Sequence, residues 1–301
     1  MSSFVAALAV GPIVLDGGLG TLLESHGHDM SSSLWSARLL LEDPDAIRRA
    51  HREYFDAGAR VAITSSYQVS HTGLAAAGFD HADVERALHR SVELARQARE
   101  DAGLGADEAW VAASVGPYGA ALADGSEYTG AYGRTVDELR EWHRPRLAAL
   151  AAAAPDVLAI ETVPSLVEVE AITAELDGIG IPAWVSVTVA DGRLRAGDDL
   201  ADAFALAAGV PEIVAAGVNC CDTAEITGAL AALRASGGGL PGVVYPNSGE
   251  LWHAQERAWS GSASEIAAHA GDWAAGGARL VGGCCRVGPD QISAVARRLV
   301  R

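Results

Sequence analysis

Short apolar runs alternate along the chain with longer segments in which apolar residues recur every three or four positions. The short runs are rich in β-branched residues and end in glycine or polar residues. Runs of this continuous kind are typical of parallel strands that are buried on both faces. Eight of them are predicted as strands, at residues 13–18, 59–67, 110–116, 157–163, 183–189, 212–220, 242–248 and 278–285.

The segments between these runs are predicted as helices. The first, at 41–58, begins with an Asp-Pro pair and ends at a glycine, which are common start and stop signals. The others lie at 84–103, 135–154, 165–178, 199–209, 223–239, 264–277 and 289–301. Eight strands alternating with helices over 301 residues fit one (β/α)₈ TIM barrel, which typically needs about 250 residues. We therefore predict a single α/β domain over residues 1–301.

Polar and glycine-rich motifs lie where these strands would end. They are LDGG, TSSYQ, SVGPYG, ETVPS, GVNCC, YPNSGE and GGCC. In a closed barrel the carboxyl ends of the strands meet around one mouth, where barrel enzymes carry their active sites. A doubly wound open sheet is the competing architecture. It would not bring all of these motifs together, so they favour the barrel.

The charge of the chain limits its partners. The net charge is −17 and the isoelectric point is near 4.8, so the surface should repel nucleic acid and anionic membranes. Small molecules are the expected partners, and the sequence leaves the oligomeric state open. All 22 basic residues are arginine. The absence of lysine excludes Schiff-base chemistry on a lysine and a phosphate-binding Walker lysine.

The location of the chain follows from two further features. The first residues include a short apolar run without a basic flank, and no uncharged apolar run is long enough to span a bilayer. We therefore expect a cytoplasmic protein, in which thiols stay reduced. Its four cysteines are then candidates for metal binding or catalysis rather than for disulfides.

The cysteines form two adjacent pairs, Cys220–Cys221 and Cys284–Cys285, each at the end of a predicted strand. Thiolates of Cys220, Cys284 and Cys285 could hold Zn²⁺ and leave one position open, as in a catalytic zinc site. Such a site suits the binding and deprotonation of a thiol substrate more than the activation of water. Because no glycine lies at the bend before Cys221, we assign Cys220 to the metal and expect Cys221 either to be packed in the core or to lie behind the metal ligands.

Two structural roles for the cysteines and one other class of zinc enzyme are the alternatives to this interpretation. Free cysteines are often small buried hydrophobic residues, and four cysteines can form a closed structural site. A water-activating zinc hydrolase would use histidine and carboxylate ligands, but the strand ends lack histidine. The nine histidines show no metal-binding spacing, and His51 and His89 are expected at the surface of amphipathic helices.

Several segments together resemble the homocysteine S-methyltransferase family. They run in family order from residue 15 to residue 286 and are LDGGLGTLLE, ITSSYQVSHTGL, SVGPYGAALADGSEYTGAYG, ETVPSLVE, GVNC, VVYPNSGE and GGCCR. DGSEYTGAYG and YPNSGE resemble the branch that uses S-methylmethionine or S-adenosylmethionine rather than the betaine-dependent branch. The resemblance implies a zinc barrel that transfers a methyl group from a sulfonium to the thiol of homocysteine, giving methionine.

The resemblance also implies roles for individual residues. Cys220, Cys284 and Cys285 match the catalytic zinc ligands. Asp16 and Glu161 match the acids that hold the homocysteine amino group. The other substrate-binding candidates are Gly17 and Gly18, whose backbone would approach the substrate, Tyr67, whose ring would face a cationic donor, and Asn219, which precedes the first ligand.

The sequence leaves open which residues face the donor, which acceptor is used and whether the barrel is catalytic. Glu127 and Tyr128 are further candidates to face the donor. The acceptor could instead be another thiol or a selenol, such as selenohomocysteine. A third alternative is a barrel that binds zinc or a thiol without catalysis.

Overall fold

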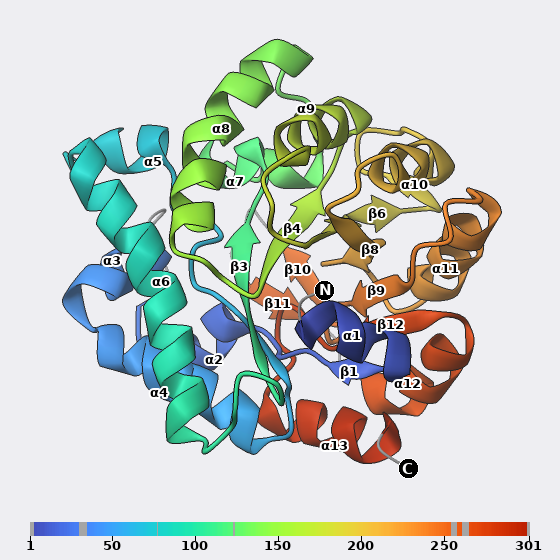
Figure 1. The fold of residues 1–301 in the computed structure, drawn as a ribbon, viewed down its shortest axis with the longest axis horizontal. Helices are drawn as coiled ribbons and strands as arrows, with labels where there is room; N and C mark the ends of the chain where they lie inside the picture. The colour runs from blue at the N-terminus through green and yellow to red at the C-terminus, as the bar shows by residue number, and fades with distance from the viewer. Residues whose placement is uncertain are drawn as a thin grey trace.

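The computed structural model describes residues 3–29, 35–76, 78–122, 124–253, 258–260 and 265–299. Eight parallel strands form its central sheet, in the order β1-β12-β9-β8-β5-β4-β3-β2 (Figure 1). Their bounds are β1 Ile13–Val14, β2 Val61–Ile63, β3 Trp110–Val115, β4 Val157–Val163, β5 Ala183–Val187, β8 Ile213–Asn219, β9 Gly242–Tyr245 and β12 Ala278–Val281. All eight strands predicted from the sequence are confirmed.

The sheet closes between its first two strands. Leu15 and Val61 form a parallel bridge, and the amide of Arg60 donates to the carbonyl oxygen of Val14 at 2.7 Å. The result is the (β/α)₈ barrel expected from the sequence. No helix in the described ranges is long and apolar enough to cross a membrane.

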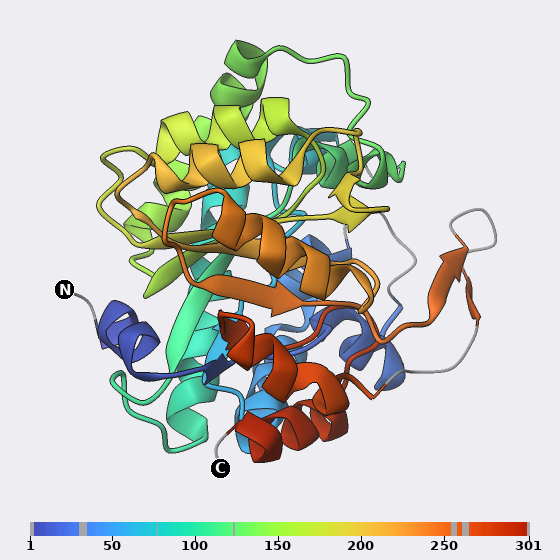
Figure 2. The same cartoon turned by 90° about the vertical axis from the view of Figure 1, so that its right-hand side faces the viewer.

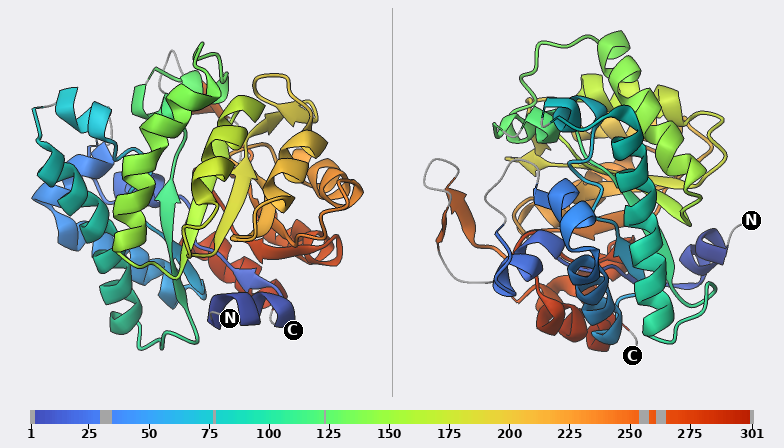
Figure 3. Two further views of the ribbon diagram at one scale, coloured as in Figure 1. Left: turned by 45° about the horizontal axis from the view of Figure 1, so that its top comes forward. Right: turned by 90° about the vertical axis from the view of Figure 1, so that its left-hand side faces the viewer.

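Helices surround the barrel, as Figure 3 shows for those outside β3 and β4. Their bounds are α2 Leu19–Ser25, α3 Trp35–Glu42, α4 Pro44–Asp56, α5 His71–Ala76, α6 His81–Asp101, α7 Tyr118–Leu122, α8 Val136–Ala152, α9 Leu166–Leu176, α10 Leu200–Ala208, α11 Glu225–Ala235, α12 Ile266–Ala275 and α13 Pro289–Leu299, with a 3₁₀ turn, η1, at Ser126–Tyr128. Asp43 caps the amide of Ala46 at the start of α4, as its Asp-Pro signal predicts. Reciprocal capping boxes start α6 and α8.

The amino-terminal end of the barrel is closed by α1 (Ser3–Val10), which the sequence patterns did not predict as a helix. Phe4 of this helix is fully buried, and its ring packs edge-on against Trp110 and near Trp184 inside the barrel. In the side view of Figure 2, α1 lies at the end of the barrel opposite the β10–β11 hairpin. The plug closes one end of the barrel, so the candidate chemistry lies at the other.

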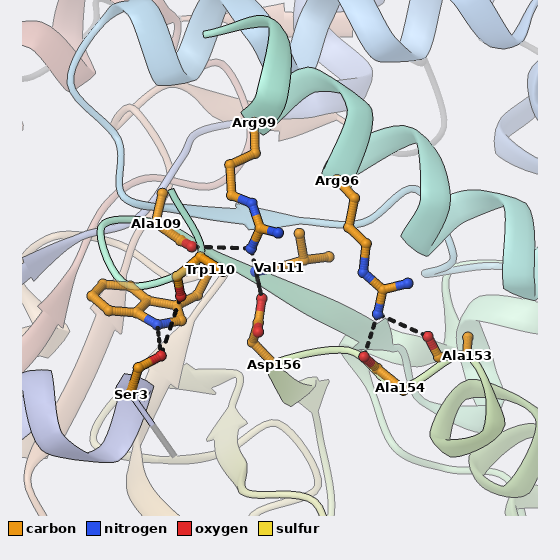
Figure 4. Close-up of polar contacts among 10 residues, drawn as sticks. Ser3, Arg96, Arg99, Ala109, Trp110, Val111, Ala153, Ala154 and Asp156 are labelled. Atoms are coloured by element: carbon orange, nitrogen blue, oxygen red, sulfur yellow. Dashed lines mark hydrogen bonds and ion pairs between the residues drawn. The ribbon is translucent and has the colours of Figure 1, made fainter. Parts of the chain in front are cut away.

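Polar contacts tie the same end together (Figure 4). Arg99 of α6 donates to the carbonyl oxygen of Ala109 and to the carboxylate of Asp156, both at 3.2 Å. Arg96 donates to the carbonyl oxygens of Ala153 and Ala154, just after α8, where a helix leaves acceptors unpaired. These bonds connect α6, β3 and the start of β4 on the face remote from the strand-end motifs.

Two short hairpins lie at the opposite, carboxyl end of the barrel. Strands β6 (Val189–Ala190) and β7 (Arg193–Leu194) form one hairpin after β5. Strands β10 (Leu251–His253) and β11 (Ala258–Ser260) form the other, which projects from the barrel in Figures 2 and 3. Neither hairpin was predicted, because each strand is too short to show a period.

Candidate active site

Three cysteine side chains meet at the mouth of the barrel. Cys220 follows β8, and Cys284 and Cys285 follow β12, which is separated from β8 in the sheet by β9 alone. Their Sγ atoms are 2.8 Å apart between Cys220 and Cys284, 3.8 Å between Cys220 and Cys285, and 4.0 Å between Cys284 and Cys285. The three sulfurs form a cluster that could hold a metal ion.

Glycines allow the chain to bend into this cluster after β12. A Cβ on Gly283 would lie 2.2 Å from Cγ1 of Val287, and one on Gly282 would lie 2.6 Å from Cβ of Leu15. The turn is then held by backbone bonds, including that from the amide of Cys284 to the carbonyl oxygen of Pro246 at 2.8 Å. The bend expected at these glycines is therefore present, and it turns two successive side chains toward one point.

On the β8 side the bend is made without glycine. Cys220 has a φ of 51°, in the left-handed region that non-glycine residues rarely adopt. Asn219 before it is fully buried, and its Oδ1 accepts hydrogen bonds from the amide of Thr162 and the hydroxyl of Ser186, both at 2.8 Å. Its Nδ2 donates to Oγ1 of Thr162. The structure therefore places the Asn219 amide between β4, β5 and β8, where it braces the strand that carries Cys220.

The spacing of the sulfurs tests whether a metal would fit. Tetrahedral zinc with Zn–S bonds of about 2.3 Å places its sulfur ligands about 3.8 Å apart. The two longer sulfur distances, 3.8 and 4.0 Å, match that spacing. The 2.8 Å pair would have to open by about 1 Å, which one rotamer adjustment of a thiol can supply. The residues present therefore fit a zinc ion with one open position.

The thiols differ in their surroundings. Hydrogen bonds from Cys220 and then Cys284 lower the pKa of Cys285 well below its usual value. Cys221 is buried among the residues between the strands and the outer helices, and burial raises the pKa of its thiol. It does not belong to the cluster. Cys221 is thus packed in the core, which is one of the two roles expected for it from the sequence.

Two carboxyl groups lie buried inside the same end of the barrel. Asp16 is 1% exposed and Glu161 is 7% exposed. Oδ2 of Asp16 accepts a hydrogen bond from the amide of Ile63 at 2.8 Å, whereas its Oδ1 has no partner among the described residues. Burial raises the pKa of Asp16 well above its usual value, and the charge of Glu161 adds to that effect. Such a pair favours a cationic group as its partner.

Glu161 is held by a polar network inside the barrel. Its Oε1 accepts a hydrogen bond from the Ser114 hydroxyl, and the Tyr245 hydroxyl also hydrogen-bonds to this carboxyl group. The Tyr245 hydroxyl in turn lies 2.6 Å from Oγ of Ser186 and accepts a bond from Nε1 of Trp184. Burial raises the pKa of Glu161 to about 7. A pKa this close to neutrality is typical of functional carboxyl groups.

The glycines after Asp16 face the cysteine loop. A Cβ on Gly17 would lie 2.1 Å from the carbonyl oxygen of Val287, and one on Gly18 would lie 2.6 Å from that of Cys284. Gly18 also donates its amide to the Val287 oxygen at 3.0 Å. The structure therefore gives both glycines a packing role against the loop that carries two of the sulfurs.

Tyr67 lies in the loop after β2. Its ring packs on Gly116, where a Cβ would come within 2.7 Å of the ring carbons, and its hydroxyl hydrogen-bonds to Thr162. Burial raises its pKa well above the usual value, and the nearby groups include Tyr128, Cys220 and Glu127. The ring is therefore close to the cysteine cluster.

Tyr128, in another loop, lies within electrostatic range of the cluster. It ends η1, in the loop between β3 and α8. The charge of Cys220 raises its pKa most, followed by burial and the charges of Cys285, Glu127 and Cys284. The charges of the cysteines thus reach both tyrosines, and Glu127 adds a half-buried carboxyl group whose pKa burial raises.

One expectation for the histidines is wrong. His51 of α4 is fully buried, and neither ring nitrogen has a hydrogen-bond partner among the described residues. Burial alone lowers its pKa to about 4. His51 lies on the same helical face as Ile47 and Tyr54, and that spacing is the signal that could have placed it inside. His89 is exposed, as expected.

Sequence reasoning also missed a buried arginine. Arg146 of α8 is 2% exposed and donates to the carbonyl oxygens of Gly116 at 2.9 Å, Ser66 at 3.0 Å and Tyr67 at 2.7 Å. It shares a helix face with the buried Leu139 and Leu150, and this apolar spacing was the available signal. Arg146 joins the loops after β2 and β3 behind Tyr67.

Comparison with known proteins gives consistent matches over nearly the whole chain. A family model described as homocysteine S-methyltransferase matches residues 13–299. The homocysteine S-methyltransferase of Escherichia coli (strain K12) is 45% identical and covers 95% of this chain and 94% of its own. Homocysteine S-methyltransferase YbgG of Bacillus subtilis (strain 168) is 42% identical, covering 94% and 93%. The crystal structure of the homocysteine methyltransferase MmuM from Escherichia coli, metallated form, has a TM-score of 0.85 at 43% identity, covering 95% of this chain and 96% of that chain.

Proposed function

The chain belongs to the homocysteine S-methyltransferase family, and we propose that it transfers a methyl group from a sulfonium donor to the thiol of homocysteine at a zinc ion held by Cys220, Cys284 and Cys285. The observation that carries the proposal is the meeting of two kinds of group at one barrel mouth. A cluster of three sulfurs lies at the same end as two buried carboxyl groups, Asp16 and Glu161. Homocysteine carries the two complementary groups, a thiol and an ammonium.

The carboxyl groups would bind the substrate ammonium. Asp16 offers Oδ1, which has no partner among the described residues. Glu161 is fixed in place by Ser114 and Tyr245 and titrates near neutrality. An ammonium in direct contact with both carboxyl groups would favour their ionised forms. With the amino group anchored there, the thiol would reach toward the three cysteines.

When bound, the zinc ion would keep the acceptor sulfur deprotonated at neutral pH. The thiol proton goes to solvent. A lone pair of the acceptor sulfur then forms the new S–CH₃ bond, while the S–CH₃ bond of the donor breaks and its electron pair stays on the donor sulfur. The products are methionine and a neutral thioether. Because the sulfonium is already a good leaving group, the side chains contribute mainly by positioning the reactants.

The aromatic rings near the cysteines suit a cationic donor. A sulfonium can be stabilised by the face of an aromatic ring. The charge of Cys220 acts on both Tyr67 and Tyr128, and a tyrosine is uncharged at neutral pH, so each ring offers such a face. The donor methyl group would therefore approach the acceptor sulfur between these rings.

The test combines metal content with turnover. Purified protein is analysed for zinc per chain, and methionine formation from homocysteine is measured with S-methylmethionine and with S-adenosylmethionine. We expect one zinc and turnover with a sulfonium donor. Cys285→Ala should lose both, whereas Cys221→Ala, the matched control in the adjacent core, should keep both.

Two results would contradict the proposal. Zinc without methionine from either donor would exclude this substrate assignment and direct the search to another thiol or a selenol acceptor. Full activity of metal-free protein or of Cys285→Ala would overturn the role of the cysteine cluster.

A further inference from the structure

Two loops that are far apart in the sequence pack together beside the cysteine cluster. One is the loop after β3 that contains η1, and the other contains the β6–β7 hairpin after β5. A Cβ on Gly130 would lie 3.0 Å from Cβ of Ala196 and 3.2 Å from Cβ of Ser165, so the first loop passes directly over the end of β4. Figure 2 shows both loops at the same end of the barrel.

Arg195 follows the hairpin and points toward η1. Its guanidinium carbon is 5.9 Å from the centre of the Tyr128 ring. Its Nε is closed off from solvent and donates to no acceptor among the described residues. Its backbone amide, by contrast, donates to the carbonyl oxygen of Thr188 at 3.2 Å, which holds the hairpin in place. Arg195 is thus a half-buried cation whose side chain has no ion pair with an acidic group in the part of the chain that the structure describes.

Glu127 is its counterpart in the other loop. Its Oε2 is also closed off from solvent and accepts no hydrogen bond from a described residue. The backbone of Glu127 packs on Gly119, where a Cβ would lie 2.4 Å from its amide nitrogen. Glu127 lies near Tyr67 and Cys285. A carboxylate oxygen and a guanidinium nitrogen, both closed off from solvent and without a hydrogen-bond partner among the described residues, therefore lie near Tyr128.

These two charges are separate from the acids that hold the acceptor, Asp16 and Glu161. Asp16 follows β1, and Arg195 lies in the loop after β5; in the closed order of eight strands, β1 and β5 lie opposite each other. Glu161 lies on β4, next to β5, but Ser114 and Tyr245 hold its carboxyl group among the buried side chains of the barrel. The acceptor would therefore be anchored inside the barrel, whereas Arg195 and Glu127 lie in the loops beyond the strand ends.

We propose that Arg195 binds the α-carboxylate of the methyl donor and that Glu127 binds its α-ammonium, so that the enzyme selects an amino-acid sulfonium. This assignment rests on the proposed function, since it concerns the donor of that reaction. The donor carries three charges: a carboxylate for Arg195, an ammonium for Glu127 and a sulfonium for the rings of Tyr67 and Tyr128. A charge-assisted bond at each end would orient the sulfonium methyl toward the cysteines.

The experiment compares truncated donors with truncated side chains. The donors are S-methylmethionine, its methyl ester, which lacks the carboxylate, and 4-(dimethylsulfonio)butanoate, which lacks only the ammonium. The variants are Arg195→Met and Glu127→Gln. Arg193→Met is the matched control, because Arg193 is an exposed arginine of the same hairpin whose side chain donates to the carbonyl oxygen of Gly197.

For Arg195→Met we expect the KM for S-methylmethionine to rise about 10- to 100-fold, as for the loss of one charged hydrogen-bonding partner. Its KM for the methyl ester should stay within about twofold of wild type, because that donor has no carboxylate to lose. Glu127→Gln should raise the KM for S-methylmethionine but leave that for 4-(dimethylsulfonio)butanoate unchanged. The KM for homocysteine should be unchanged in both variants, and Arg193→Met should behave as wild type.

Several outcomes would overturn the assignment. A rise in the homocysteine KM for Arg195→Met would place this arginine with the acceptor instead. If Arg195→Met raised the KM for S-methylmethionine and for its methyl ester equally, the role of Arg195 would be structural. Equal KM values of the wild-type enzyme for these two donors would lead to the same conclusion. The last comparison needs no variant, so it decides the matter even if a variant folds poorly. Absence of turnover by wild type with every sulfonium would instead remove the proposed function itself.

Discussion

Arg146 donates a hydrogen bond of 2.7 Å to the backbone carbonyl oxygen of Tyr67, although its helix lies outside the barrel and Tyr67 lies at its mouth. The same guanidinium holds the carbonyl oxygens of Ser66 and Gly116. Gly116 in turn is the surface against which the Tyr67 ring packs. One outer side chain therefore sets the position of an aromatic residue beside the sulfur cluster.

Removal of the Arg146 guanidinium should lower the stability of the protein. Arg146→Met would leave three carbonyl groups without their donor, and bonds to charged groups contribute about 1.5–3 kcal/mol each. We expect the free energy of unfolding to fall by about 3 kcal/mol or more, measured by urea denaturation. Arg90→Met, on the exposed face of α6, is the control and should change stability by less than about 0.5 kcal/mol. Equal stability of the two variants would show that the carbonyl groups do not depend on Arg146.

The binding of homocysteine should weaken as the pH falls through neutrality. The pKa of Glu161 is raised to about 7, so this carboxyl group becomes protonated below that pH and no longer attracts an ammonium. We expect the KM for homocysteine to rise about tenfold per pH unit below pH 6, measured at saturating donor. In Glu161→Gln the KM should be high at every pH and this dependence should disappear. The exposed Glu170→Gln should keep the wild-type profile, and a profile retained by Glu161→Gln would assign the titration to another group.

The glycine before the cysteine pair should be needed for metal binding. A Cβ in Gly283→Ala would meet the buried Val287 side chain at 2.2 Å, so the turn that carries Cys284 and Cys285 must move. We expect at least about a tenfold loss of zinc affinity, measured by competition with a chelator. Gly228→Ala is the opposite case, because its Cβ meets nothing within 4 Å inside α11. It should stabilise the protein by up to about 1 kcal/mol and leave zinc binding unchanged.

His51 should make the protein sensitive to acid. Its pKa is lowered to about 4 in the folded protein, against about 6.5 in the unfolded chain. Between these values the unfolded chain binds more protons, so stability falls as the pH falls, by about 1.4 kcal/mol per pH unit. His51→Leu should remove this contribution, seen as a shallower loss of unfolding free energy between pH 6.5 and 4. At pH 7 the variant should be at least as stable as wild type, because it removes two ring nitrogens that have no hydrogen-bond partner among the described residues. The exposed His89→Gln should follow the wild-type curve.

The strands and the motifs at their ends could be predicted from the sequence. Buried parallel strands are continuous apolar runs, and all eight runs became strands of the barrel. A closed barrel brings strand ends together, so the predicted meeting of Cys220 with Cys284 and Cys285 follows from the fold class and the order of the strands. Cys221 could be separated from them because an extended chain points neighbouring side chains to opposite faces.

Only the tertiary structure decided how side chains from different loops meet. The contact of Arg195 with Tyr128 and the reach of Arg146 to Tyr67 depend on the path of irregular loops, for which the sequence has no period. The α1 plug is apolar on most of its surface, so its pattern gave no sign that Phe4 closes the barrel. The apolar periodicity of a segment reflects only the average burial of its faces. The partner of one buried charge depends on distances set by the closure of the whole barrel, and those distances determine which acids, rings and arginines surround the three cysteines.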